Sequence, residues 1–205
     1  MPKIKIPRKS TRVDMTAMCD VAFLLLTFFM LATRFKPDGP LEIIPPSSTA
    51  QAEVPDRGAF EVFFDKGGRV FFSCTDADLS ERLVDYVNSN GHLGLTAAER
   101  SQFLRLCRGA GVGEPIAGIP EALSPLSLAQ PGIPALDSAH NQLRPWVAAL
   151  LAANGGRAPD NILIDGDQSS RYPSFREVLR AFTDNNVFHF KLITSMASAD
   201  EPLNQ

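Results

Sequence analysis

The longest apolar run of the chain lies near its N-terminus and has the length of a membrane span. From Val13 to Thr33 the chain holds 21 residues without Lys, Arg, Gly or Pro. As an α-helix this segment would measure about 31 Å, close to the hydrocarbon core of one bilayer. No second apolar run of this length follows, so the pattern predicts a single-pass membrane protein with its transmembrane helix at residues 13–33.

A cleaved signal peptide is the main alternative for this run. Signal peptides end in small residues at a cleavage site, whereas here Leu31, Ala32 and Thr33 are followed by Arg34. An acidic residue at the head of the apolar core also disfavours a signal peptide. We therefore interpret the run as a span that is retained.

One side of the predicted helix is polar. At about 100° per residue, Thr16, Asp20 and Thr27 lie within about 40° of one line, while Asp14 lies at the helix end as an N-cap. An ionised Asp at the centre of a span costs on the order of 3 kcal/mol, and such residues commonly mark proton or ion routes. The pattern predicts that Asp20 carries protons, with Thr16 and Thr27 beside the path. The alternative is a carboxyl that only hydrogen-bonds a partner helix. A path would require partner helices, because one helix cannot enclose it.

Charge is distributed unevenly around the span. Residues 1–12 carry five basic side chains and no acidic one, whereas the remaining residues carry 15 basic and 23 acidic side chains. A basic cluster before a span predicts a cytoplasmic N-terminus and an exported C-terminal part. A basic arm can also bind nucleic acid, but the acidic body excludes a nucleic-acid-binding module.

The three cysteines show no metal-ligand spacing. Cys19 lies in the span, and Cys74 and Cys107 could pair if their region is exported, although nothing in the sequence requires it.

A proline-rich linker separates the span from a folded region. Residues 34–58 include five prolines with Ser and Thr between them, which predicts an extended segment. Residues 59–200 then show alternating strand and helix patterns and are expected to form one exported domain, followed by a tail at 201–205.

The domain pattern predicts a small α/β fold. The expected elements are a hairpin at FEVFFDKGGRVFF with a Gly67-Gly68 turn, a helix at 78–90, a strand at NILID, a helix opened by a capping box at Ser174–Glu177, and a strand at FHFKLI. Alternation places Phe60, Val62 and Phe64 on one face of the hairpin and Glu61 and Phe63 on the other, and it places Phe188, Phe190 and Leu192 on one face of the last strand. The order β-β-α-(insertion)-β-α-β predicts a two-layer α/β (α+β) domain with helices on one face of a mixed sheet.

Residues 92–157 interrupt this order. A capping box at Thr96–Glu99 predicts a helix running to about Arg108, and a second helix is expected from about Pro145 to Asn154. Residues 111–137, which are rich in Pro and Gly, are expected to be irregular. The insertion is either a passive surface elaboration or a docking surface for a partner.

The span and the segment after it resemble the ExbD/TolR family. The resemblance rests on Asp14-Met15-Thr16-Ala17-Met18-Cys19-Asp20-Val21 and on LEIIPPSST, where Ile44-Pro45-Pro46-Ser47 stands in place of the family's Leu-Pro-x-Ser. The family's aspartate and threonine match Asp20 and Thr16, whereas its common Pro after the threonine is Ala17 here. The resemblance implies a partner-contacting linker segment at Ile43, Ile44 and Pro45. It also implies that residues 42–44 of the linker form a strand with a second copy. In the short family members, residues 92–157 have no counterpart.

The same resemblance implies a function. The chain is expected to be the proton-motive-force-coupling subunit of an inner-membrane motor, with an ExbB-like polytopic ring and a TonB-like protein as partners and a homodimer as its own state. A TolR-like role in envelope integrity is the close alternative, and a membrane-tethered binding module without proton coupling is the alternative from another class. A peptidoglycan-anchored stator is not expected, since no wall-binding domain is evident. No catalytic, phosphate-binding or metal motif is present, so we expect neither an enzyme nor a cofactor other than the translocated protons.

Overall fold

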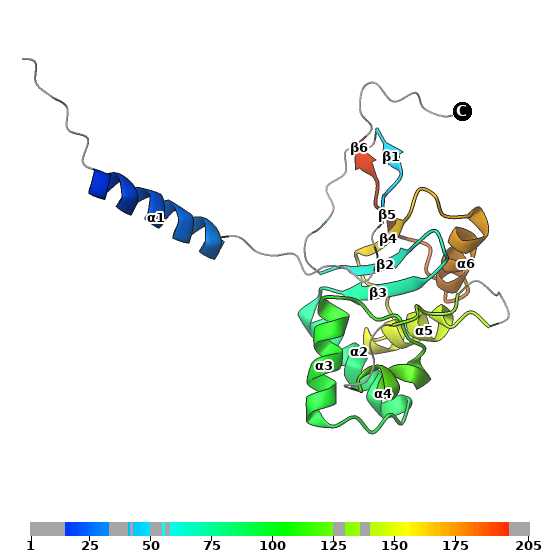
Figure 1. Ribbon diagram of the computed structural model, residues 1–205. Helices are drawn as coiled ribbons and strands as arrows, with labels where there is room; N and C mark the ends of the chain where they lie inside the picture. Colours follow the sequence, from blue (N-terminus) through cyan, green and yellow to red (C-terminus); the bar gives the residue numbers. More distant parts are fainter. Residues whose placement is uncertain are drawn as a thin grey trace, which may run out of the picture. The chain divides into compact units, whose positions relative to one another are not determined.

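The computed structural model describes residues 15–32, 41, 43–49, 55, 58–124, 130–135 and 140–196 (Figure 1). The chain forms two compact units, residues 1–36 and 37–205, and each is described by itself. The first unit contains the helix α1, Met15–Ala32, which lies inside the predicted span. The basic arm, Asp14 and the tail lie outside the described residues.

The second unit combines short strands with helices. Its elements in chain order are β1 (Ser47–Ser48), β2 (Phe60–Phe64), β3 (Val70–Cys74), α2 (Ala77–Asn90), α3 (Ala97–Arg108), the 3-10 helix η1 (Ile116–Gly118), α4 (Ile119–Ala122), α5 (Leu143–Ala153), β4 (Ile162–Gly166), α6 (Tyr172–Thr183), β5 (Lys191–Leu192) and β6 (Ser195–Met196). An N-terminal apolar helix followed by a mixed α/β domain confirms the predicted fold class.

The main sheet has the strand order β3-β2-β4-β5. The hairpin strands β2 and β3 are antiparallel, whereas β2 pairs with β4, and β4 with β5, in parallel. The hairpin turn uses Gly68 at a φ of 77°, and the Asp65 carboxylate accepts hydrogen bonds from the amide and the Nε of Arg69 (2.9 and 2.8 Å). The sheet is therefore mixed, as the sequence predicts. Figure 1 shows the separate β1–β6 pair next to β5, away from β3.

The helices cover one face of this sheet because each presents an apolar stripe to it. In α2 the stripe is Leu79, Leu83 and Val87, spaced four residues apart, and all three are buried. The helix begins at a cap in which Asp76 accepts a hydrogen bond from the amide of Leu79 (2.9 Å). Together with Val178 of α6 these residues form one continuous hydrophobic core.

The second face of the sheet is also covered. Phe63 and Phe71 stack there with centroids 6.0 Å apart, and Phe63 is only 9% exposed. The glycines of the following loop lie against the two rings: a Cβ on Gly111 would come within 2.6 Å of Phe63, and one on Gly113 would overlap Phe71. The predicted alternation is confirmed at Phe63, which lies on the face opposite Phe60, but alternation within β2 does not reveal that the insertion covers this second face.

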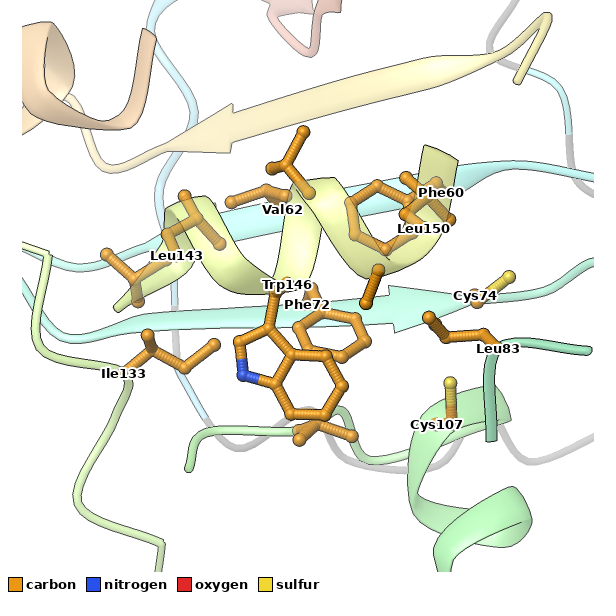
Figure 2. Packing of buried hydrophobic residues seen from close by; sticks show 14 of the residues in the cluster. Phe60, Val62, Phe72, Cys74, Leu83, Cys107, Ile133, Leu143, Trp146 and Leu150 are labelled. Atoms are coloured by element: carbon orange, nitrogen blue, oxygen red, sulfur yellow. The ribbon is translucent and has the colours of Figure 1, made fainter. Parts of the chain in front are cut away.

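The insertion is part of the core. Trp146 on α5 is 1% exposed, lies 4.7 Å from Phe72 between ring centroids, and donates a hydrogen bond from Nε1 to the carbonyl of Glu114 (2.9 Å) (Figure 2). Phe103 on α3 packs against the same indole. The insertion therefore completes the hydrophobic core, and the interpretation as a passive surface elaboration is wrong.

Both predicted helices of the insertion are present. The capping box of α3 forms in full, with Thr96 and Glu99 exchanging hydrogen bonds. The helix α5 begins at Leu143, two residues before the predicted start at Pro145. Residues 111–137 are less irregular than predicted, because η1 and α4 form within them.

The insertion also pairs with the outer edge of β3. Phe72 and Val112 exchange backbone hydrogen bonds (3.0 and 2.7 Å), and the amide of Ile133 donates to the carbonyl of Val70 (2.7 Å). These contacts occupy backbone groups that an edge strand would otherwise leave open.

Two predictions for the C-terminal part are wrong. The helix α6 begins at Tyr172 with no side-chain cap, so Ser174 and Glu177 lie inside it and form no capping box. Pro173 explains the earlier start, since its fixed φ and missing amide suit a first turn. The strand predicted at FHFKLI is only Lys191–Leu192 (β5), and Phe188 is 63% exposed, because the chain turns at Asn186 (φ 59°) and buries Val187 instead.

Replacement of Trp146 tests the role of the insertion in the core. We expect Trp146→Ala to lower the free energy of unfolding by about 3–5 kcal/mol, because a buried indole and its hydrogen bond are lost. Circular dichroism of the full chain in detergent during urea unfolding measures this. Phe188→Ala, which removes an exposed ring, is the control and should change stability by less than about 0.5 kcal/mol. Equal, small effects would show that the insertion is peripheral.

Candidate functional site

Asp20 is the single charged residue of α1. The helix has 18 residues, about 27 Å, and is long and apolar enough to cross a membrane by length and composition. Asp20 lies in its second turn and is exposed, and no partner for its carboxylate is present among the described residues. An isolated carboxylate on an apolar helix needs polar groups from elsewhere to remain charged in a bilayer.

The two threonines share the helix with Asp20. Thr16 precedes Asp20 by four residues and Thr27 follows it by seven, so the three lie along one side of a regular helix. The Thr27 hydroxyl donates to the carbonyl of Leu24 (3.0 Å). This bond satisfies the hydroxyl hydrogen within the helix, which leaves the Thr27 oxygen as an acceptor.

The linker segment at residues 43–49 is bound to the folded domain. The amide of Gln168 donates to the carbonyl of Ile44 (2.8 Å), and the amide of Ser195 donates to the carbonyl of Pro46 (3.0 Å). The Ser195 hydroxyl also donates to the carbonyl of Pro45 (3.3 Å). Hydrogen bonds rather than buried apolar surface hold the segment, since Ile44 is 57% exposed.

Asp167 connects this contact to the end of β4. Its Oδ1 accepts from the amide of Ser169 (2.7 Å), and its Oδ2 lies 3.5 Å from the amide of Ile44. The carboxylate is buried and thus fixes the loop on which the linker rests.

The strand that residues 42–44 are expected to form with a second copy stays a prediction, and the linker also pairs within its own chain. Ile43 and Ile44 are described but form no strand, whereas Ser47–Ser48 (β1) pairs in parallel with Ser195–Met196 (β6) of the same chain. The pairing within the chain begins only after Pro45 and Pro46, because proline lacks the amide that a ladder needs. Residue 42 lies outside the described residues.

A surface hollow of about 310 Å³ lies beside the linker contact. Its walls are mostly apolar and include Pro46, Phe64, Ile164, Tyr172, Phe175 and Leu192. Pro46 belongs to the linker and the other residues to the domain, so a displacement of the linker changes the shape of this hollow.

The described residues contain no group of three side chains that could hold a metal ion. The geometry thus offers a lone carboxylate in an apolar helix and a hydrogen-bonded linker on a rigid domain.

A comparison with protein families identifies the first half of the chain. Residues 7–105 match the family described as biopolymer transport protein ExbD/TolR. This part of the chain belongs to the ExbD/TolR family. The match covers α1, the linker, the hairpin and α2 and ends within α3, so it extends into the segment predicted to be an insertion.

Membership in the ExbD/TolR family defines the coarse role of the chain. Members are subunits of motors that energise transport, not enzymes, and they work with polytopic membrane proteins such as ExbB or TolQ. The family match and α1, the one helix of span length among the described residues, together indicate a single-pass inner-membrane protein. No curated protein and no solved structure matches the chain significantly.

Sequence reasoning missed the residues that hold the linker. Asp167-Gln168-Ser169 has the form of an Asx turn, which was a usable signal for an ordered loop. Ser195 carries no such signal, because its role depends on a chain segment about 150 residues away.

Replacement of Ser195 tests the linker contact. We expect Ser195→Pro to increase the opening of the 43–48 segment about tenfold, because two hydrogen bonds of about 0.5–1.5 kcal/mol each are lost. Hydrogen exchange at Ser48 and limited proteolysis of the linker measure the opening. Ser195→Ala, which retains the amide, should have an intermediate effect. Unchanged exchange in both variants would contradict the contact.

Proposed function

We propose that this chain is the proton-coupling subunit of an ExbB–ExbD-type motor that energises TonB-dependent transport, with Asp20 as the proton carrier. The observation that supports the proposal is one ionisable group in an otherwise apolar 18-residue helix of an ExbD/TolR member. Placing such a group in lipid costs free energy, and groups of this kind commonly serve proton or ion movement.

The proposed mechanism is a change of charge on Asp20. The neutral acid is compatible with an apolar surface of the partner helices, whereas the carboxylate requires a polar one. Protonation from the exported side and release to the cytoplasm therefore alternate the preferred orientation of α1. One charge that crosses 100 mV gains about 2.3 kcal/mol, so a few protons exceed the cost of a modest helix movement.

The linker passes this movement to the exported domain. Residues 43–48 are held at one edge of the domain by hydrogen bonds to Gln168 and Ser195, and Pro46 forms part of the wall of the hollow. A pull on the linker thus acts directly on the surface next to β5 and β6. An ExbB-like ring supplies the polar surfaces around α1, and two copies of this chain share one ring.

Asp20→Asn tests the proton role. Asparagine has nearly the same size but does not titrate, so we expect gradient-driven uptake through TonB-dependent transporters to fall to the uncoupled level. Copurification with the polytopic partner should persist. Asp20→Glu should restore part of the activity because it titrates, and Cys19→Ala is the control at the same depth.

Two outcomes would change the proposal. Full uptake by an assembled Asp20→Asn complex would leave the span as an anchor and favour a tethered binding module. Normal uptake in a strain without this chain, together with leakage of periplasmic proteins, would favour the TolR-like role.

A further inference from the structure

Cys74 and Cys107 meet in the core where the insertion contacts the edge of β3. Cys74 is the last residue of β3, and Cys107 lies one residue before the end of α3. Both are fully buried, whereas the third cysteine, Cys19, lies in the exposed helix α1. Figure 2 shows the Cys107 sulfur pointing from α3 toward Leu83 and the end of β3.

The two cysteines are neighbours in the core, on either side of Leu83 in Figure 2. The main chain of Cys74 lies near enough to the Cys107 sulfur to influence its ionisation, and the Cys74 thiol donates to the carbonyl of Asp76 (3.8 Å). On the same border of β3, Phe72 exchanges backbone hydrogen bonds with Val112 of the insertion. A disulfide requires two cysteines on neighbouring segments, and the ends of α3 and β3 bring these two together.

We propose that Cys74 and Cys107 are joined by a disulfide in the mature protein, which links the insertion covalently to the sheet. Both are thiols in the structure, and the Cys74 thiol is turned toward the carbonyl of Asp76. The inference rests on the export of the domain proposed above, since disulfides form and persist in oxidising compartments.

The bond forms by exchange with an exported thiol–disulfide oxidoreductase. One cysteine thiolate attacks the oxidised disulfide of that enzyme and forms a mixed disulfide, and the second thiolate then displaces the enzyme. The chain loses two protons and two electrons, and the enzyme leaves as a dithiol. Oxidation therefore joins the two sulfurs without any change at Cys19.

Burial sets the order of folding and oxidation. Burial raises the pKa of Cys74 to about 11, and it raises the pKa of Cys107 further. Because the thiolate is the attacking species, the folded core suppresses the exchange. The disulfide therefore forms before α3 closes over β3, and it resists reduction afterwards.

Counting of free thiols tests the proposal in the full chain. Membranes from cells that produce a Cys19→Ser variant are denatured in detergent and treated with a maleimide-linked polymer, which forms one adduct with each free thiol. We expect no adduct before reduction and two adducts after it, and adding Cys74→Ala should free Cys107 and give one adduct without reduction. Two adducts without reduction, or a dimer band that reductant removes, would overturn the proposal.

Thermal unfolding provides a second readout. The oxidised chain should melt roughly 10 °C above the same chain reduced in denaturant and refolded without oxidant, as expected for a typical disulfide in a domain of this size. Equal melting temperatures would argue against a stabilising crosslink.

The failure of this inference can be distinguished from that of the proposed function. A phosphatase that is active only after export, fused to the C-terminus, reports the location of the domain. Active fusion with two free cysteines would overturn the disulfide alone, whereas inactive fusion would overturn the export on which both proposals rest.

Discussion

The cost of one carboxylate in a bilayer is the constraint on which this molecule depends. The helix α1 buries none of its residues in the structure, and Asp20 is its single charged group. An apolar helix of this length is stable in lipid without help, but its ionised aspartate is not, so the helix requires surrounding protein. The family match is consistent with this requirement, because ExbD/TolR members work with polytopic membrane partners.

Sequence reasoning succeeded where the signal is local. The hairpin around Gly67-Gly68, the helix α2 and the capping box at Thr96 each depend on residues within one turn or one strand, and each is present in the structure. The prediction of a capping box at Ser174 was wrong, because Pro173 lets the helix begin earlier. For the candidate site, the polar stripe could be read from spacing alone, but the partners of the linker could not. Ser195 becomes relevant only when the fold brings it to Pro45 and Pro46.

The burial of Phe63 and Trp146 could likewise not be predicted from local signals. Their neighbours come from segments that are distant in sequence, with Gly111 against Phe63 and Phe72 against Trp146. A pattern within one strand shows which residues can share a face, but it does not show what covers that face. The insertion could therefore be divided into helices from the sequence, whereas its place in the core required the structure.

The contacts of Val112 and Ile133 with β3 make the two edges of the main sheet unequal. With that border occupied, a further strand can join the main sheet only beside β5, which has no outer neighbour among the residues that the structure describes. Growth of the sheet by intermolecular pairing is consequently one-sided, and chains cannot stack edge to edge into an open-ended ribbon through both borders. That asymmetry protects the domain against aggregation through its sheet.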